Sequence, residues 1–230
     1  MITIILPTYN EAENICELIR SLLYSIKHPV DILVVDDDSS DLTWKLVEDM
    51  NNPRVRVIRR INERGLASAI GRGLKESEGD IVGWMDADMC MPAEVVAQMA
   101  DWVGAYDIAI GSRYVKGGRD CRGIFRVFTS RLINLFAGLL LGSDIKDYDS
   151  GFLLMKKEVL ERVTFPASGY GDYFIEFVYK CKKAGFKIKE VPYVFRDRQK
   201  GRSKTAGSFF GFIRLGLGYI RRIVLLRFSS

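Results

Sequence analysis

The sequence predicts an α/β fold with a doubly wound, mostly parallel sheet and a C-terminal amphipathic helical appendage. Through the first half of the 230-residue chain, short apolar runs alternate with segments of helical period. This alternation is typical of parallel sheets. Polar motifs follow the apolar runs directly, where sheets of this kind bind their ligands. The segment 209–228 combines a helical period with aromatic and basic residues.

The first half predicts a repeating order of strand and helix. The expected strands are residues 2–6, 32–35, 55–58, 81–85 and 108–110. The expected helices are residues 11–26, 42–50, 66–76 and 92–103. Residues 11–26 carry a helical period through Ile15, Leu18, Ile19 and Leu22. Asp41 is suited to cap the second helix, and Pro92 to the first turn of the fourth.

The second half predicts a long helix at 122–141, a strand at 152–155, a helix at 172–183 and a strand at 188–195. Residues 196–204 (RDRQKGRSK) form a basic loop. The longest uncharged stretch in either helical candidate covers 12 residues, 132–143, which is shorter than the 18 or more apolar residues typical of a membrane span. Without an internal linker, residues 1–205 are expected to form one domain and residues 206–230 its appendage.

The appendage has two distinct faces on a helical wheel. One face gathers Arg214, Gly218, Arg221 and Arg222, and the other Phe210, Ile213, Leu217, Ile220 and Val224. A basic face beside an aromatic and aliphatic one is typical of a helix that lies in a membrane interface. A helix packed on the protein's own core shows the same pattern, so both interpretations stay open.

Charge is distributed unevenly along the chain. Residues 1–112 hold 10 Lys+Arg and 19 Asp+Glu, and residues 113–230 hold 24 and 10. The acidic half suits a cation site, and the basic half suits phosphate, nucleic acid or a membrane surface. Mutual neutralisation of the two halves is the plainer alternative. Nucleic acid is not expected as a partner, because no recognised motif is present and the acidic half repels a polyanion.

Cysteine spacing and the N-terminus indicate a cytoplasmic location. No two of the four cysteines stand at C-x-x-C spacing, so neither a zinc site nor a redox pair is suggested. The first residues lack the basic stretch of a secretory signal. Reduced thiols in the cytoplasm are expected.

Acidic residues after two of the strands are candidates for ligand binding. Asp86 and Asp88 stand at i and i+2 after the fourth strand, so both point the same way. Neighbouring carboxylates need a compensating charge, and their hard oxygens suit Mg²⁺ or Mn²⁺ held together with a diphosphate. Asp37, after the second strand, suits ribose hydroxyls or a base edge. The alternatives are a solvated turn for the first motif and a helix N-terminal acidic cluster for the second.

The segment after the first strand, Pro7-Thr8-Tyr9-Asn10-Glu11, offers an aromatic plane and a carboxylate to a nucleoside. It is not the glycine-rich fingerprint of a dinucleotide site.

Seven motifs in this order resemble the family 2 glycosyltransferases with the GT-A fold, and most closely the dolichol-phosphate mannose synthases. They are Pro7-Thr8-Tyr9-Asn10-Glu11, Val34-Val35-Asp36-Asp37-Asp38-Ser39, Arg64-Gly65-Leu66, Met85-Asp86-Ala87-Asp88, Ile110-Gly111-Ser112-Arg113-Tyr114, Asp149-Ser150-Gly151-Phe152 and Gly201-Arg202-Ser203-Lys204. The resemblance extends from residue 2 to about residue 205.

The resemblance implies an inverting, metal-assisted transfer of a hexose from a nucleoside diphosphate sugar to a polyprenyl (dolichyl) phosphate. Mannose and GDP-mannose are favoured, at the cytoplasmic face of a membrane to which the protein binds peripherally. Donor-binding residues would be Pro7, Tyr9, Glu11, Val35, Asp37, Asp86, Ala87, Asp88, Arg113, Arg198 and Lys204. Asp86 and Asp88 would hold Mg²⁺ or Mn²⁺. The acceptor phosphate would meet Arg113, Arg126 and Ser130, and catalysis would rest on Asp88, Arg113 and Arg126.

One departure from the family pattern stands beside the metal motif. Cys90 occupies the position where these synthases usually have a glutamine that supplies a third metal ligand, and a thiol is a poor ligand for Mg²⁺.

Two other interpretations of the function remain open. The first is a family 2 enzyme that uses UDP-glucose or UDP-N-acetylglucosamine, with a lipid phosphate or a glycan hydroxyl as acceptor. A hydroxyl acceptor needs a general base, for which Asp147, Asp149 and Asp172 are candidates. A phosphate acceptor is already an anion near neutral pH and needs none. The second reading is a scaffolding descendant of the enzyme, against which the intact Asp86, Asp88 and Arg113 argue.

Overall fold

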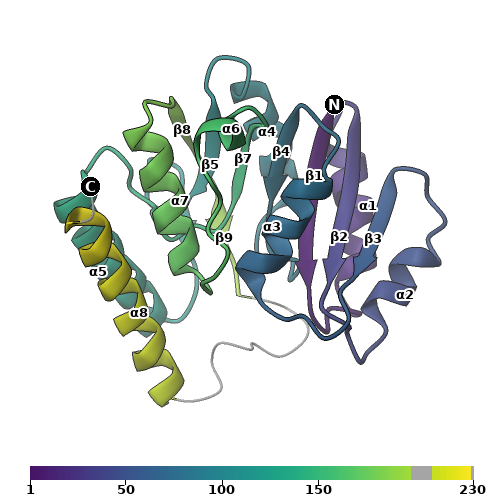
Figure 1. Cartoon of the computed structure of the whole chain (residues 1–230), viewed down its shortest axis with the longest axis horizontal. Coiled ribbons are helices and arrows are strands. Elements are labelled where there is room, and N and C mark those ends of the chain that lie inside the picture. Colours follow the sequence, from purple (N-terminus) through teal and green to yellow (C-terminus); the bar gives the residue numbers. More distant parts are fainter. Residues whose placement is uncertain (198–208, 229–230) are drawn as a thin grey trace.

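The centre of the protein is a seven-stranded sheet with the strand order β3-β2-β1-β4-β7-β5-β8 (Figure 1). The computed structural model describes residues 1–197 and 209–228, with side chains in the last helix from residue 216. The strands are β1 Ile2–Thr8, β2 Val30–Asp36, β3 Val55–Arg59, β4 Ile81–Trp84, β5 Ile108–Ser112, β7 Leu153–Lys156 and β8 Ile188–Pro192. All neighbours are parallel except β7, which runs antiparallel to β4 and β5.

Helices cover both faces of this sheet, which confirms the predicted doubly wound α/β fold. α1 (Ile15–Ser25) and α4 (Ala93–Trp102) lie on one face, and α3 (Leu66–Glu76) and α7 (Asp172–Lys183) on the other (Figure 1). α2 (Thr43–Glu48) packs beside β3, and the short α6 (Val159–Arg162) follows β7. α5 (Ile124–Leu141) and α8 (Phe209–Phe228) lie side by side next to α7.

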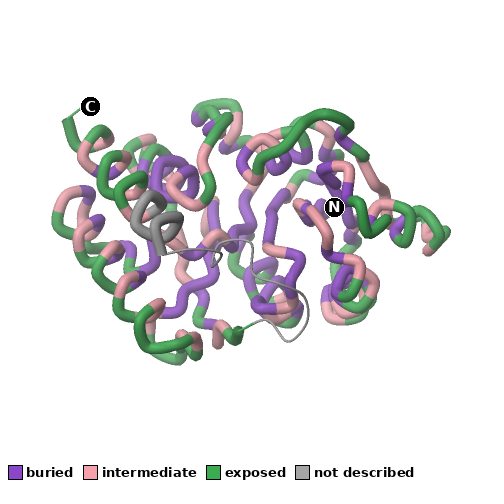
Figure 2. Tube along the Cα trace, turned by 90° about the horizontal axis from the view of Figure 1, so that it is seen from below, coloured by how far each residue is buried: buried purple, intermediate pink, exposed green. Residues whose placement is uncertain are grey.

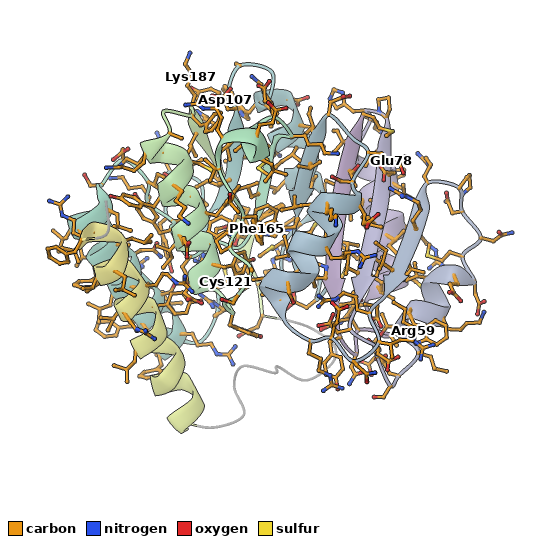
Figure 3. All side chains as sticks on the ribbon, in the orientation of Figure 1. Arg59, Glu78, Asp107, Cys121, Phe165 and Lys187 are labelled. Carbon is orange, nitrogen blue, oxygen red and sulfur yellow. The ribbon has the colours of Figure 1, made fainter. Side chains whose placement is uncertain are left out.

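Apolar side chains of the strands alternate between two cores. Ile5 of β1 packs with the α3 and α7 side, whereas Ile4 and Leu6 pack with the α1 and α4 side. The strands β1, β2, β4, β5 and β7 are therefore buried along most of their length, whereas β3 and β8 at the two sides of the sheet are only partly buried (Figure 2). On the α7 side, fully buried Trp84 meets Phe165 with ring centroids 5.3 Å apart, and Phe165 lies between α3 and α7 (Figure 3).

The antiparallel strand β7 brings a remote loop to the end of the sheet where the parallel strands have their carboxyl ends. Leu153, the first residue of β7, is in register with Trp84 of β4 and with Ile110 of β5. The residues just before β7 therefore lie at the carboxyl ends of the parallel strands. Figure 3 shows the two ends of the sheet, with Arg59 at the carboxyl end of β3 and Asp107 beside Lys187 at the opposite edge.

Several element boundaries differ from the sequence prediction for local reasons. α1 begins at Ile15 rather than at residue 11, because residues 11–14 form a turn in which Glu11 accepts the N–H of Asn14. The predicted strand 188–195 is two strands, β8 and β9 (Val194–Phe195), and β9 pairs with β6 (Arg119–Asp120) in a second, two-stranded sheet. Neither β6 nor α6 was predicted.

Helix α5 turns its large apolar side chains outward. Its buried residues are Ser130, Asn134, Ala137 and Leu141, whereas Phe128, Leu132, Leu135 and Leu139 are exposed. Within the described part of the chain, α5 is also the helix whose length and composition would allow it to cross a bilayer. Counting uncharged residues alone did not reveal this, because Arg126 and Arg131 interrupt the run.

Helix α8 has the predicted bounds. The helical wheel, however, did not show which of its residues face the protein. Ile223 is fully buried, and Arg222 forms an ion pair with Asp172 of α7, with Nη2 and Oδ2 2.9 Å apart. Arg222 therefore faces the protein rather than belonging to an outer basic face. Leu217 and Ile220 are exposed, so the predicted apolar face points away from the core. The side chains of Phe210, Ile213 and Arg214 and the expected boundary at 205/206 lie outside the described part.

Gly83 in the middle of β4 allows β7 to approach. A Cβ at this position would overlap the backbone oxygen of Leu153 and the backbone of Leu154. We expect Gly83→Ala to lower the free energy of unfolding by about 1–3 kcal/mol, because strand backbone cannot yield as a side chain can. Urea unfolding measures this, and Gly104→Ala, with nothing within 4 Å of its Cβ, is the control. Equal stability of the two variants would contradict the described β4–β7 packing.

Candidate functional site

A cavity of about 430 Å³ opens at the carboxyl edge of the sheet. It brings together residues that follow β1, β2, β4, β5 and β9, residues that precede β7 and α7, and one residue each from α5 and α8. Its lining includes Pro7, Tyr9, Glu11, Asp37, Arg64, Asp86, Ala87, Asp88, Cys90, Arg113, Arg122, Arg126, Asp149, Ser150, Tyr170, Gly171, Asp197 and Tyr219.

The end of β1 supplies an aromatic plane, as predicted. Tyr9 lines the cavity, and the guanidinium of Arg64 lies over its ring at 4.4 Å from the centroid. Such stacking orients a cation and an aromatic ring with respect to each other. Pro7 and Glu11 line the same part of the cavity. Together these residues give this part of the cavity an aromatic ring, a guanidinium and a carboxyl group.

Asp37 is held by partners that the sequence did not reveal. Its Oδ1 accepts a hydrogen bond from Nε of Arg60 at 2.7 Å, and its Oδ2 accepts the backbone N–H of Gly65 at 2.8 Å. The Arg60 side chain is buried, so it compensates the charge of Asp37 inside the protein. Asp37 therefore has a fixed orientation and faces the cavity with its remaining lone pairs.

Asp86 and Asp88 lie beyond the end of β4, and both line the cavity. Oδ1 of Asp88 accepts the backbone N–H of Cys90 at 3.1 Å, and Met89 between them has a left-handed φ of 63°. This tight turn restrains the Asp88 carboxyl group, and Asp86 lines the same cavity. The thiol of Cys90 lies 3.8 Å from the backbone oxygen of Asp88.

The oxygen donors of this motif suit Mg²⁺ or Mn²⁺. No group of three His, Cys, Asp or Glu side chains that could hold a metal occurs among residues 1–197 and 209–228. Asp86 and Asp88 are the residues of this motif that would hold such an ion.

Arg113, directly after β5, is anchored by Asp147. Its Nε and backbone N–H both donate to Oδ2 of Asp147 at 2.8 Å, and its Nη2 donates to Oδ1 at 2.6 Å. Both side chains are almost fully buried. Burial alone would lower the pKa of Arg113, but the Asp147 carboxylate raises it well above its ordinary value. Arg113 is thus permanently charged and fixed in direction.

Asp149 connects Arg113 to helix α5. Its backbone oxygen accepts Nη2 of Arg113 at 2.8 Å, and its Oδ2 accepts the hydroxyl of Ser130 at 3.2 Å. Burial raises the pKa of Asp149, while the charge of Arg113 opposes this effect. Ser130 does not line the cavity itself and reaches it through Asp149.

Two further arginines stand on the same side. Arg122 donates to both oxygens of buried Asp120, with Nη2 and Oδ2 2.7 Å apart. Burial alone would raise the pKa of Asp120, but Arg122 and Arg113 lower it. Arg126 at the start of α5 pairs loosely with Asp197, at 3.4 Å. The cavity therefore contains the carboxylates of Asp86 and Asp88 after the central strand β4, and arginines from α5, from the turn before it and from the end of β5.

Not every predicted site residue faces the cavity. Val35 is fully buried in the hydrophobic core and does not line it. Arg198 and Lys204 lie outside the described residues. Asp147 is tied to Arg113, and Asp172 pairs with Arg222, so of the three base candidates Asp149 alone lines the cavity.

Several lining residues were missed by the sequence analysis, among them Arg122, Tyr170, Gly171 and Tyr219. Tyr170, Gly171 and Tyr219 come from α8 and the turn before α7, and Arg122 from the turn before α5. No motif marked them, although Arg122 stands in the basic half of the chain and Tyr219 on the appendage helix.

Comparison with known proteins gives consistent results. The model of Glycosyl transferase family 2 matches residues 3–164. A dolichol-phosphate mannosyltransferase of Pyrococcus furiosus is 40% identical over 222 residues, which cover 93% of this chain and 62% of that protein. A polyprenol monophosphomannose synthase of Mycolicibacterium smegmatis is 36% identical over 216 residues, with 89% and 81% covered.

Among solved structures, glucosyl-3-phosphoglycerate synthase from Mycobacterium tuberculosis, in complex with Mn²⁺, UDP and glucosyl-3-phosphoglycerate, has a TM-score of 0.74 at 22% identity. The match covers 99% of this chain and 79% of that chain, which shows a shared fold. The family match over more than half of the chain, the two relatives and this fold agree, and the chain belongs to the family 2 glycosyltransferases with the GT-A fold.

Proposed function

We propose that the protein transfers a hexose from a nucleoside diphosphate sugar to a polyprenyl phosphate, with mannose from GDP-mannose as the favoured donor. The observation that carries this proposal is one cavity that is lined both by the paired carboxylates of Asp86 and Asp88 and by the arginines Arg113, Arg122 and Arg126. The names of the Pyrococcus and Mycolicibacterium relatives, a dolichol-phosphate and a polyprenol monophosphate mannose enzyme, support it.

The donor is proposed to bind along the end of β1 and β4. Tyr9 and Asp37 would hold the nucleoside, and the diphosphate would extend toward Asp86 and Asp88. A divalent ion on these two carboxylates would supply charge neutralisation for the leaving diphosphate. Mn²⁺ and Mg²⁺ occur with UDP in the solved glucosyl-3-phosphoglycerate synthase structures, which supports this choice of cofactor.

The acceptor phosphate is proposed to bind at Arg113 and Arg126. The pair Arg126–Asp197 is partly exposed and long, and such surface pairs contribute only about 0–1 kcal/mol, so Arg126 can exchange Asp197 for a phosphate at little cost. Arg113 remains fixed by Asp147 and contributes a stationary positive charge. The phosphate oxygen then attacks the anomeric carbon from the side opposite the leaving group, which inverts its configuration. The phosphate is already an anion near neutral pH, so no general base is needed.

A hydroxyl acceptor with a UDP-sugar donor is the second candidate, and Asp149 is the observation that favours it. This carboxyl group lines the cavity and burial raises its pKa, as is common for a general base. However, the Asp149 carboxylate already accepts a hydrogen bond from the Ser130 hydroxyl, and the positive charge of Arg113 lies near it. Both interactions make the carboxylate a weaker base. Transfer to glycan hydroxyls but not to polyprenyl phosphate would favour this candidate.

We further propose that the protein binds the cytoplasmic face of a membrane peripherally. On α5 the residues Phe128, Leu132, Leu135 and Leu139 form one exposed apolar stripe, and Leu217 and Ile220 are exposed on the neighbouring α8. Large apolar side chains concentrated on one surface indicate an interaction site. Because Arg126 faces the cavity and Ser130 packs inside, α5 is expected to lie along the membrane surface rather than across it.

The metal motif gives the first prediction for this function. We expect Asp88→Ala to lower turnover roughly 100- to 1000-fold, the usual cost of losing one preorganised electrostatic group. Removal of divalent ions from the wild type with EDTA should abolish transfer, and Mn²⁺ or Mg²⁺ should restore it. Radiolabelled mannose transfer measures both. Full activity of Asp88→Ala, or of the EDTA-treated enzyme, would remove the metal from the mechanism.

The Arg113–Asp147 pair gives a second prediction that separates stability from catalysis. Arg113→Ala leaves Asp147 buried without its partner, so we expect a loss of about 3–5 kcal/mol in unfolding free energy together with a loss of activity. In the double variant Arg113→Met/Asp147→Leu, apolar packing replaces the pair and most of the stability should return. Activity should remain absent in this variant, because the fixed charge is missing. Restored turnover would show that Arg113 has only a structural role.

The exposed stripe gives a third prediction. We expect Phe128→Ser/Leu132→Ser to weaken binding to vesicles of phosphatidylglycerol and phosphatidylcholine roughly tenfold or more, because each side chain loses apolar burial in the interface. Vesicle cosedimentation measures this. The control is Tyr24→Ser, which removes an exposed aromatic side chain from α1 on the other face of the sheet. Equal binding of the double variant and the wild type would contradict the proposed membrane surface.

A further inference from the structure

Helix α8 contributes a side chain to the catalytic cavity. Among the residues of α8 with described side chains, Tyr219 lines the cavity. Asp149, from the segment before β7, and Gly171, from the turn before α7, line it too. The ring of Tyr219 packs against the core on the α7 side. The appendage helix is therefore part of the cavity wall and does more than cover the outside of the domain.

The hydroxyl of Tyr219 has a defined environment. A Cβ on Gly171 would overlap this hydroxyl, so the absence of a side chain at Gly171 makes room for it. The hydroxyl lies close enough to the Asp149 carboxylate for the two groups to affect each other's pKa, and both residues line the same cavity. Burial first and the Asp149 charge second raise the pKa of Tyr219 well above its ordinary value, so Tyr219 stays protonated and acts as the donor.

The position of Tyr219 is fixed by the next turn of α8. Ile223, four residues later, is fully buried, and Arg222, three residues later, pairs with Asp172 and Glu176 of α7. Residues three and four apart share one face of a helix. The anchors of α8 on α7 therefore hold Tyr219 toward the cavity, while Leu217 and Ile220 remain exposed.

Asp149 is the point at which α8 meets the proposed acceptor residues. Its carboxylate receives the Ser130 hydroxyl from α5 and lies 3.6 Å from Nη2 of Arg113. A buried carboxylate close to an incoming phosphate repels it unless donors and cations hold and neutralise it. Tyr219 supplies one of these donors from α8, which packs beside Ser130's helix α5.

We propose that Tyr219 is a positioning residue for the acceptor phosphate, which acts by holding Asp149 and, through it, Ser130 and Arg113. This inference rests on the proposed function and deepens it, because it makes the C-terminal helix a component of the acceptor end of the site. Tyr9 and Asp86, which are proposed for the donor, come from the ends of β1 and β4, and donor binding should be unaffected.

The substitution Tyr219→Phe removes the hydroxyl and keeps the ring in the core. We expect the acceptor KM to rise roughly tenfold, as for a hydrogen bond to a charged group, with the donor KM unchanged. The assay uses a short-chain, water-soluble polyprenyl phosphate, so membrane binding does not enter the result. Tyr24→Phe, which removes the hydroxyl of an exposed tyrosine on α1, is the matched control and should behave as the wild type.

A second variant, at Gly171, disturbs the Tyr219 hydroxyl without changing Tyr219 itself. Gly171 has a φ of −141°, which any residue adopts, so Gly171→Ala introduces a methyl group without backbone strain. This methyl group should displace the Tyr219 hydroxyl and give the same rise in acceptor KM. The double variant should be little worse than either single variant, because both remove one interaction.

Calorimetric binding of the short-chain polyprenyl phosphate gives a readout without turnover. Weaker binding by Tyr219→Phe with unchanged affinity for GDP and Mn²⁺ supports the inference. Unchanged acceptor binding and KM overturn it, as does an equal loss for donor and acceptor with a lower thermal midpoint, which would indicate a structural role. If the wild type transfers sugar normally and Tyr219→Phe does too, the inference fails and the proposed function stands. A wild type that binds no polyprenyl phosphate overturns both.

Discussion

The buried ion pair between Arg113 and Asp147 is the interaction on which the catalytic end of the protein depends. An arginine inside a protein keeps its charge, so Asp147 must accompany it or the fold loses several kcal/mol. Through this pair, the end of β5 is joined to the segment that leads into β7. The same arginine holds the backbone of Asp149, which receives Ser130 from α5. One fixed positive charge thereby organises a strand, a loop and a helix around the place proposed for the acceptor.

Carboxylates and arginines line one cavity because of the sheet topology. The parallel strands β1, β2 and β4 deliver Tyr9, Asp37, Asp86 and Asp88 to a single edge. Antiparallel β7 starts at this edge, so the residues before it meet the end of β5. A donor diphosphate with its metal and an acceptor phosphate are both anionic, and they can approach each other only if separate charges hold each of them. The geometry provides these charges on different elements, so positioning and electrostatics are sufficient for the proposed chemistry.

Sequence reasoning succeeded where chemistry and local pattern coincide. The buried strands, the doubly wound order and the placement of Asp86, Asp88 and Arg113 after strands could be predicted because each depends on neighbouring residues. It failed where partners are remote in the chain. A strand of two residues such as β6 has no period, and the engagement of Asp37 by Arg60 depends on a tertiary contact. For α8, the helical wheel showed which residues share a face, but not which face packs against the protein. Tyr219 was therefore not predicted to line the cavity.

In the proposed reaction, the acceptor phosphate attacks the anomeric carbon directly, with Asp86 and Asp88 on the donor side and Arg113 and Arg126 on the acceptor side. The anomeric configuration of the product that the purified protein forms from GDP-mannose and a polyprenyl phosphate, determined by NMR, tests this directly. A single displacement converts the α-linked donor into a β-linked mannosyl phosphate, and we expect this inverted product. An α-linked product would require a second displacement through another nucleophile and would rule out direct attack by the phosphate.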